Sequence, residues 1–306
     1  MAMPHKNKVG WVAVALCALL GCGGKDPHAP TDTLESGTVH ISADESFKPV
    51  IDSQVQVFES AYPGAKVVVH YKPEAECLKD LAVDSIRMVI ATRGYTKAEE
   101  AFLVDSMKVA PAKQVVAYDA VAVIVHPQSA DTLFTMQEVV SLLTGTSTKN
   151  LIPVFDGVKA TSTVRFVIDS VLKGQPLGAG VVAANGSEAV IDYVAKTKNA
   201  VGFLGVSWIG NRDDSTQLSY LSRIKAAQIE HPLVKDRFVT PAQYNIYYRR
   251  YPMVRDLVYV LKEKHNGLGH GFAYFMAGQR GQLIFKRAYL MPATLNLGTR
   301  EATLTE

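Results

Sequence analysis

The sequence lacks the short motifs that mark the common enzyme active sites. It contains no G-x-S-x-G nucleophile elbow, no H-E-x-x-H zinc motif, no Walker loop and no glycine fingerprint for a dinucleotide. No nucleophile stands in a recognisable pattern with a base either. These absences favour a protein that binds a partner or solute over an enzyme, and they imply no cofactor.

Histidine does not occur in the spacing that metal sites need. The eight histidines are scattered, and His265 and His270 come closest to ligand spacing. They flank the glycine-rich stretch 266–269, and a histidine pair on a loop is most often solvated surface. We therefore expect no metal site.

Cysteine is scarce, and charge of neither sign is in excess. Of the three cysteines, Cys17 and Cys22 lie near the N-terminus, which leaves Cys77 for the folded part. No disulfide within one chain can then stabilise that part, so its stability must come from a hydrophobic core. Of the 32 basic residues only Lys6 and Lys8 precede Cys22, and 30 remain against 29 acidic residues. This balance argues against a nucleic-acid partner.

The N-terminal apolar run is too short to span a membrane. Residues 9–21 carry no charge, but a spanning helix needs about 20 apolar residues. The run follows Lys6 and Lys8 and ends in Leu-Leu-Gly before Cys22, which is the layout of a secretory signal peptide. Residues 19–22 resemble the bacterial lipobox, whose cysteine takes a diacylglycerol. An ordinary signal peptide that happens to contain two cysteines is the alternative.

The N-terminal pattern predicts an extracytoplasmic protein anchored to the cell-envelope membrane by a lipid on Cys22. Residues 1–21 would be removed as the signal peptide. Residues 22–36 are polar, contain proline and glycine, and show no periodicity, so we expect a flexible tether there. The rest of the chain exceeds the usual size of a single core, and two lobes are expected.

Strand and helix patterns alternate from residue 38 onward. β-branched or apolar runs predict strands at 39–41, 66–71, 88–91, 120–125, 200–205 and 257–261. Capping boxes at Thr96–Glu99 and Thr135–Glu138 predict two helix starts, and a further helix is expected over 164–172, closed by Gly174. The alternation predicts an α/β fold with a parallel or mixed sheet flanked by helices.

Three junctions between a strand and the next helix carry polar side chains. They are residues 42–46, residues 92–94 and residues 160–163. Such junctions lie at the carboxyl ends of strands, where open α/β sheets bind ligands, and hydroxyls with free N–H groups suit an anion. Taken singly, each hydroxyl is better explained as a helix cap.

The order of segments resembles the phosphate-binding proteins of bacterial phosphate importers, within the two-lobed extracytoplasmic solute-binding proteins. The stretches that carry the resemblance are 122–127, 142–145 (Leu-Leu-Thr-Gly), 185–190, 199–205 and 272–292 with its Gly-Gln-Arg-Gly-Gln. It implies a type II periplasmic-binding-protein-like α/β fold in which each lobe is a mixed sheet flanked by helices. Lobe 1 would hold residues 37–118 plus 243–306, and lobe 2 residues 119–242.

The resemblance also implies a function, the binding component of an ABC importer. Phosphate or another oxyanion is the default solute, and the membrane subunits of the transporter would be the protein partner. The ligand-binding residues expected from the matching loops are Ser42, Asp44, Glu45, Ser46, Glu74, Arg93, Thr161, Ser162 and Thr163.

The ligand loops are more acidic than the family pattern. Asp44 and Glu45 stand in the first loop, Glu74 and Glu76 in the second, and the third loop keeps its hydroxyls without the usual arginine. Carboxylates around a dianion cost several kcal/mol unless they are paired. We expect Arg93, which follows a buried strand, to bridge to one of these acidic loops. A second interpretation stays open, a non-transport surface lipoprotein that binds a cationic or zwitterionic solute or a protein partner.

Overall fold

The computed structural model describes Met1 and residues 32–157 and 161–294. The strands in chain order are β1 (Gly37–Asp44), β2 (Ala65–Lys72), β3 (Ile86–Ala91), β4 (Ala112–Val125), β5 (Leu133–Phe134), β6 (Ile152–Phe155), β7 (Val182–Ala183), β8 (Ala200–Gly205), β9 (Lys225–Ala226), β10 (Gln228–Glu230), β11 (Phe238–Val239), β12 (Val254–Leu261) and β13 (Met291–Pro292). The helices are α1 (Lys48–Ala61), α2 (Glu74–Lys79), α3 (Lys97–Asp105), α4 (Met136–Thr144), α5 (Ser162–Phe166), α6 (Ser187–Lys196), α7 (Ser215–Leu221), α8 (Gln243–Tyr247), α9 (Leu268–Ala277) and α10 (Gln279–Arg287).

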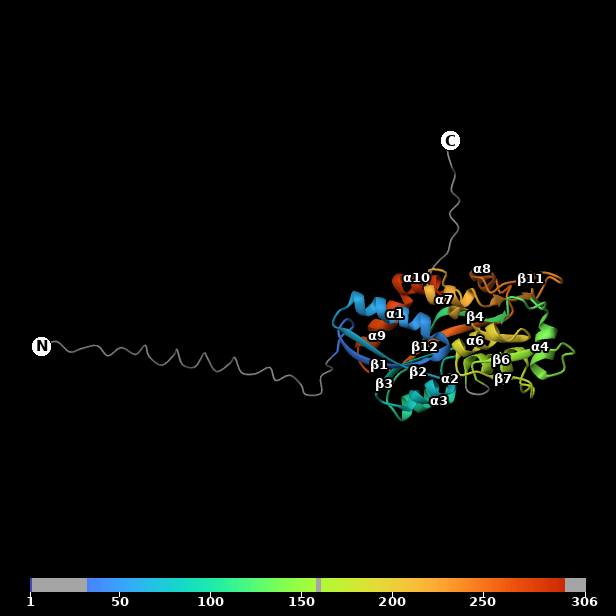
Figure 1. Cartoon of the computed structure of the whole chain (residues 1–306). Helices are drawn as coiled ribbons and strands as arrows, with labels where there is room; N and C mark the ends of the chain where they lie inside the picture. Colours follow the sequence, from blue (N-terminus) through green and yellow to red (C-terminus); the bar gives the residue numbers. More distant parts are fainter. Residues whose placement is uncertain (2–31, 158–160, 295–306) are drawn as a thin grey trace, which may run out of the picture. The chain divides into compact units, whose positions relative to one another are not determined.

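The strands of the described residues form a mixed sheet in the order β2-β1-β3-β12-β4-β8-β6-β7. β9 and β13 also pair with β4, and β11, β10 and β5 make a separate small sheet. β1 is parallel to both β2 and β3, and β6 is parallel to β7 and β8. β12 and β8 both run antiparallel to β4, β12 along its first part and β8 along its last part. Figure 1 shows β1, β2 and β3 on one side of β4 and β12, and β6 and β7 on the other.

β4 is shared by both halves of the fold. Its residues 112–120 pair with β12, and its residues 121–125 pair with β8. We call the part around β1–β3 and β12 the first half, and the part around β6–β8 the second half. The two halves are therefore mixed sheets joined through one strand, and the α/β prediction is confirmed. The residue boundaries of the lobes stay a prediction.

A hydrophobic core stabilises the described part of the chain, whose cysteine, Cys77, is free. In the first half, Phe58 of α1 packs edge-on against Phe272 and Phe275 of α9, each with ring centroids 5.3 Å apart. In the second half, Phe155 and Phe203 stack at 4.7 Å. Aromatic pairs at these distances add to the free energy of burying their area. Residues 120–125 of β4 are fully buried, as their unbroken apolar run predicts.

Local signals place the starts of α3 and α4 correctly. Both predicted capping boxes are confirmed, at the starts of α3 and α4. The helix expected over 164–172 is α5 followed by five residues of π-helix, Val167–Val171, and Gly174 adopts a positive φ of 89° just beyond it. No helix among the described residues is long and apolar enough to cross a membrane.

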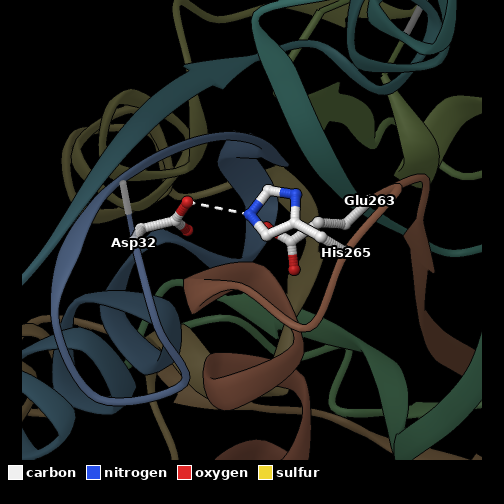
Figure 2. Close-up of side chains that lie close together, drawn as sticks. All are labelled: Asp32, Glu263 and His265. Atoms are coloured by element: carbon white, nitrogen blue, oxygen red, sulfur yellow. Dashed lines mark hydrogen bonds and ion pairs between the residues drawn. The ribbon is translucent and has the colours of Figure 1, made fainter. Parts of the chain in front are cut away.

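The tether expected over residues 22–36 stays a prediction, but its residue Asp32 contacts the folded part. The Asp32 carboxylate accepts hydrogen bonds from the backbone N–H of Leu268 and from Arg87, and it pairs with His265 at 2.8 Å (Figure 2). Each of these contacts joins residues more than 50 positions apart, so no local sequence pattern reveals them. Cys22 and the predicted signal peptide lie outside the described residues.

Candidate functional site

Seven buried polar residues meet where β4 changes partner. They come from both halves of the fold and are Asp44, Ser46, Asp119, Asp156, Ser162, Thr163 and Arg255. We call them the central cluster. Asp44 ends β1 and Ser46 follows it, Asp156 follows β6, and Ser162 and Thr163 open α5.

Three hydroxyls join the two halves inside the central cluster. Ser162 donates to the Ser46 hydroxyl across 3.3 Å, and Ser46 donates to Asp156 Oδ2 across 3.2 Å. Thr163 donates to the same Asp156 oxygen at 3.4 Å. Ser46 and Ser162, two of the residues expected in the ligand loops, thus contact each other directly.

Arg255 is the one cation of the central cluster. Its Nε donates to Asp119 Oδ2 at 2.9 Å, and its Nη1 donates to Ser162 and Thr163 at 3.0 and 3.3 Å. The guanidinium lies 5.0 Å from the centre of the Phe47 ring, a favourable position for a buried cation. Arg255 thus connects the central strands to the hydroxyls of α5.

Several buried atoms of this region have no hydrogen-bond partner among the described residues. They are one carboxylate oxygen each of Asp44, Asp119 and Asp156, Arg255 Nη2 and Ser207 Oγ. A buried polar atom without a partner costs free energy, and native proteins keep few of them. Their concentration at one place is typical of a ligand site.

The electrostatics of the cluster are dominated by burial. Burial raises the pKa of Asp44 to about 7, against the lowering effect of Arg255. The pKa values of Asp119 and Asp156 are also raised, again chiefly by burial and again opposed by Arg255. One guanidinium therefore offsets only part of the cost of three buried carboxyl groups.

A second ion pair crosses between the halves beside the central cluster. Arg165 of α5 pairs with Glu74 at the start of α2, with Nε 2.5 Å from Glu74 Oε2, and its Nη2 donates to Thr92 Oγ1 at 2.6 Å. Thr92 donates its own N–H to Glu74 at 2.8 Å. Burial pushes the pKa of Glu74 upward, but the hydrogen bonds and charge of Arg165, with those of Thr92, outweigh it and hold that pKa low.

Comparison with known proteins identifies the scaffold. A family model described as a PBP superfamily domain matches residues 28–280. The chain therefore belongs to the PBP superfamily. No curated protein matches the chain.

Solved structures agree on the two-lobed fold. A phosphate ABC transporter substrate-binding protein from Clostridium perfringens, solved with bound phosphate, is 18% identical over 84% of this chain and 100% of its own, with a TM-score of 0.69. An ABC-type phosphate transport receptor from Vibrio cholerae is 14% identical over 83% of this chain and 99% of its own, with a TM-score of 0.62. A regulatory domain of CcmR from Synechocystis PCC6803, in complex with 2-PG, is 13% identical over 79% and 97%, with a TM-score of 0.53.

The predicted bridge from Arg93 to an acidic loop of this PBP-domain protein is wrong. Arg93 does not bridge to the acidic loops but pairs with Glu99 of the α3 capping box, at 2.8 and 2.9 Å. Arg165, on the opposite half, neutralises Glu74 instead. The local sequence hid this because Glu74 and Arg165 are 91 residues apart.

The other predicted residues divide between the cluster and its surroundings. Ser42 is buried but donates to Asp80, outside the central cluster. Thr161 accepts a hydrogen bond from Val164 N as the N-cap of α5. Glu45 is half-buried, and burial, then Asp156 and Glu76, raises its pKa.

Three members of the central cluster were missed by sequence reasoning. Asp119 and Arg255 are charged residues inside predominantly apolar strands, which is the signal that could have found them. Asp156 follows the apolar run of β6 directly, one residue before Gly157.

Asp32, Glu263 and His265 have the spacing of metal ligands, with one ligand atom each within 4.8 Å (Figure 2). Arg87 Nη1 lies 2.7 Å from the Asp32 carboxylate and 2.6 Å from that of Glu263. A cation already neutralises both carboxylates, so we assign no metal to them. The expectation that His265 and His270 are solvated surface is wrong, because each contacts one of these carboxylates.

Replacing the two arginines separates the true partner of Glu74 from the predicted one. We expect Arg165→Ala to lower the free energy of unfolding by about 2 kcal/mol or more, because it leaves a buried carboxylate unpaired. Arg93→Ala breaks a half-exposed pair and should cost about 1 kcal/mol or less. Urea denaturation measures both. Glu74→Gln in the Arg165→Ala background should recover part of the loss, and equal costs for the two arginines would contradict the assignment.

The raised pKa of Asp44 predicts a pH-dependent stability. A carboxyl that holds its proton more tightly when folded than its ordinary 3.8 allows makes the folded state less stable as pH rises from about 4 to about 7. Asp44→Asn does not titrate and should lose less stability over this window, by up to a few kcal/mol. Asp105→Asn, at an exposed position of α3, is the control. Parallel pH curves for wild type and Asp44→Asn would refute the prediction.

Proposed function

We propose that the protein is the solute-binding component of an ABC importer and that its solute is phosphate or another oxyanion. The observation that carries the proposal is a buried guanidinium, Arg255, with an unpartnered Nη2 beside the hydroxyls of Ser46, Ser162 and Thr163. These groups donate hydrogen bonds from both halves of the fold, as an anion held between two lobes requires. The similar phosphate-transport proteins support the choice of solute, and we assign no catalytic activity.

The buried carboxyl groups are compatible with a protonated oxyanion. Hydrogen phosphate carries a P–OH group, which can donate to a carboxylate of Asp44 or Asp156 while its other oxygens accept from Arg255 and the hydroxyls. In the present closed arrangement Ser46 and Ser162 contact each other directly. A solute would replace that contact, so we infer that the halves separate to admit it and close around it.

One observation favours a second candidate, a cationic or zwitterionic solute on the same scaffold. Asp44, Asp119 and Asp156 outnumber the single Arg255 in the central cluster. An ammonium group would satisfy the unpartnered carboxylate oxygens directly. A surface lipoprotein without a transport role would suit such a solute or a basic protein partner.

Titration calorimetry of the purified mature protein tests the oxyanion proposal. We expect phosphate to bind, and Ser162→Ala to weaken it about 10-fold or more, because a hydrogen bond to a charged group is lost. Ser170→Ala, an exposed serine on the same segment, should leave binding unchanged. Absence of phosphate binding together with binding of an organic ammonium would favour the second candidate.

We also propose that the protein is anchored outside the cytoplasm by a lipid on Cys22. The support is the Leu-Leu-Gly-Cys sequence that ends the predicted signal peptide. The membrane subunits of the importer would then be its protein partner.

Metabolic labelling with a fatty acid tests the anchor. The wild-type protein should incorporate label and partition with membranes, because diacylglycerol is attached through the Cys22 sulfur. Cys22→Ser should do neither, and Cys77→Ser, a change at the buried thiol, should still be labelled. Equal labelling of wild type and Cys22→Ser would overturn this part of the proposal.

A further inference from the structure

A large groove lies beside the central cluster, between α2 and α3 of the first half and α5 with its π-helical continuation in the second. Its volume is about 570 Å³, and its walls include Ala75, Leu78, Val164 and Ile168. Glu74 and Arg165 line it as well. Val164 and Arg165 directly follow Thr163 of the central cluster, so one segment of chain serves both places.

The groove is larger than an inorganic oxyanion needs. Its volume equals that of roughly 20 water molecules at ~30 Å³ each, and it falls in the ~300–1,000 Å³ range of sites for organic ligands. A phosphate ion held at Arg255 would leave it unused. The size therefore points to a solute with an organic part.

The free surface of the groove is mostly apolar. Most of its charged side chains are already paired, Glu74 with Arg165, Arg93 with Glu99, and Arg165 also with Asp169 at 3.2 Å. Lys79, the remaining charged residue of the walls, is exposed. Apart from Lys79, what remains for a ligand is mainly carbon surface, most of it from Ala75 and Ile168, since Leu78 and Val164 are largely buried. An apolar group gains free energy there by leaving water.

We propose that the solute is an organic phosphate, a phosphomonoester or phosphonate with an apolar substituent. The phosphoryl group would occupy the central cluster, which rests on the proposed function, and the substituent would lie in the groove. The Glu74–Arg165 pair stands at the boundary between the two parts. The groove would thus discriminate by the substituent among solutes whose phosphoryl group binds in the same way.

Calorimetry with inorganic phosphate, methyl phosphate and phenyl phosphate tests the inference on the wild-type protein. Phenyl phosphate should bind at least 10-fold more tightly than methyl phosphate. Ala75→Trp fills the groove from an exposed position of α2 and should remove that advantage while leaving inorganic phosphate unchanged. Ala101→Trp, exposed on α3 and outside the groove walls, is the matched control and should keep it.

The outcomes separate the two proposals. If inorganic phosphate binds and phenyl phosphate binds no better than methyl phosphate, the groove does not hold the substituent and only the inference fails. An advantage for phenyl phosphate that survives in Ala75→Trp likewise places the substituent elsewhere. If none of the three phosphates binds, the oxyanion function itself fails. The wild-type series decides the matter even if Ala75→Trp does not fold.

Discussion

The arrangement of this protein depends on a buried ion pair between two neighbouring strands. Arg255 of β12 and Asp119 of β4 are cross-strand partners in the register of the sheet, and both side chains are almost fully buried. The pair stands at the end of the β12–β4 ladder, directly before β4 turns to β8. A close approach is needed there, since a Cβ at Gly205 would lie 3.2 Å from both charged groups. The guanidinium is thereby fixed where the halves meet.

Fixing one cation at this point determines what else can be buried around it. Asp44 and Asp156 are held near Arg255, yet the pKa of each is raised because burial outweighs the attraction. A carboxyl in that position can remain ionised only if it receives further hydrogen bonds or charge. The hydroxyls of Ser46 and Thr163, which donate to Asp156, supply part of this stabilisation.

The fold was largely predictable from the sequence because its signals are local. The capping boxes of α3 and α4 each involve residues three apart, and the buried run of β4 is continuous. The central cluster was predictable only where it lies on strand-to-helix junctions, as with Ser46 and Ser162. Arg255 and Asp119 are 136 residues apart, and only the pairing of β12 with β4 brings them together. Strand register over such separations is not encoded in any short window.

The difference between local signals and contacts over long sequence separations also explains why the partner of the acidic loop at Glu74 is not evident from the sequence. The sequence predicts a bridge from Arg93 to one of the acidic loops, but Arg93 is engaged by Glu99 of the local capping box of α3. Arg165 reaches Glu74 from the other half, just as Arg255 reaches Ser162 from the first half. Each half therefore contributes an arginine to the other: Arg165 pairs with Glu74, and Arg255 donates a hydrogen bond to Ser162. Separating the halves would expose both contacts to water at once, which weakens them by raising the local dielectric. The two halves are therefore held together in part by interactions that exist only between them.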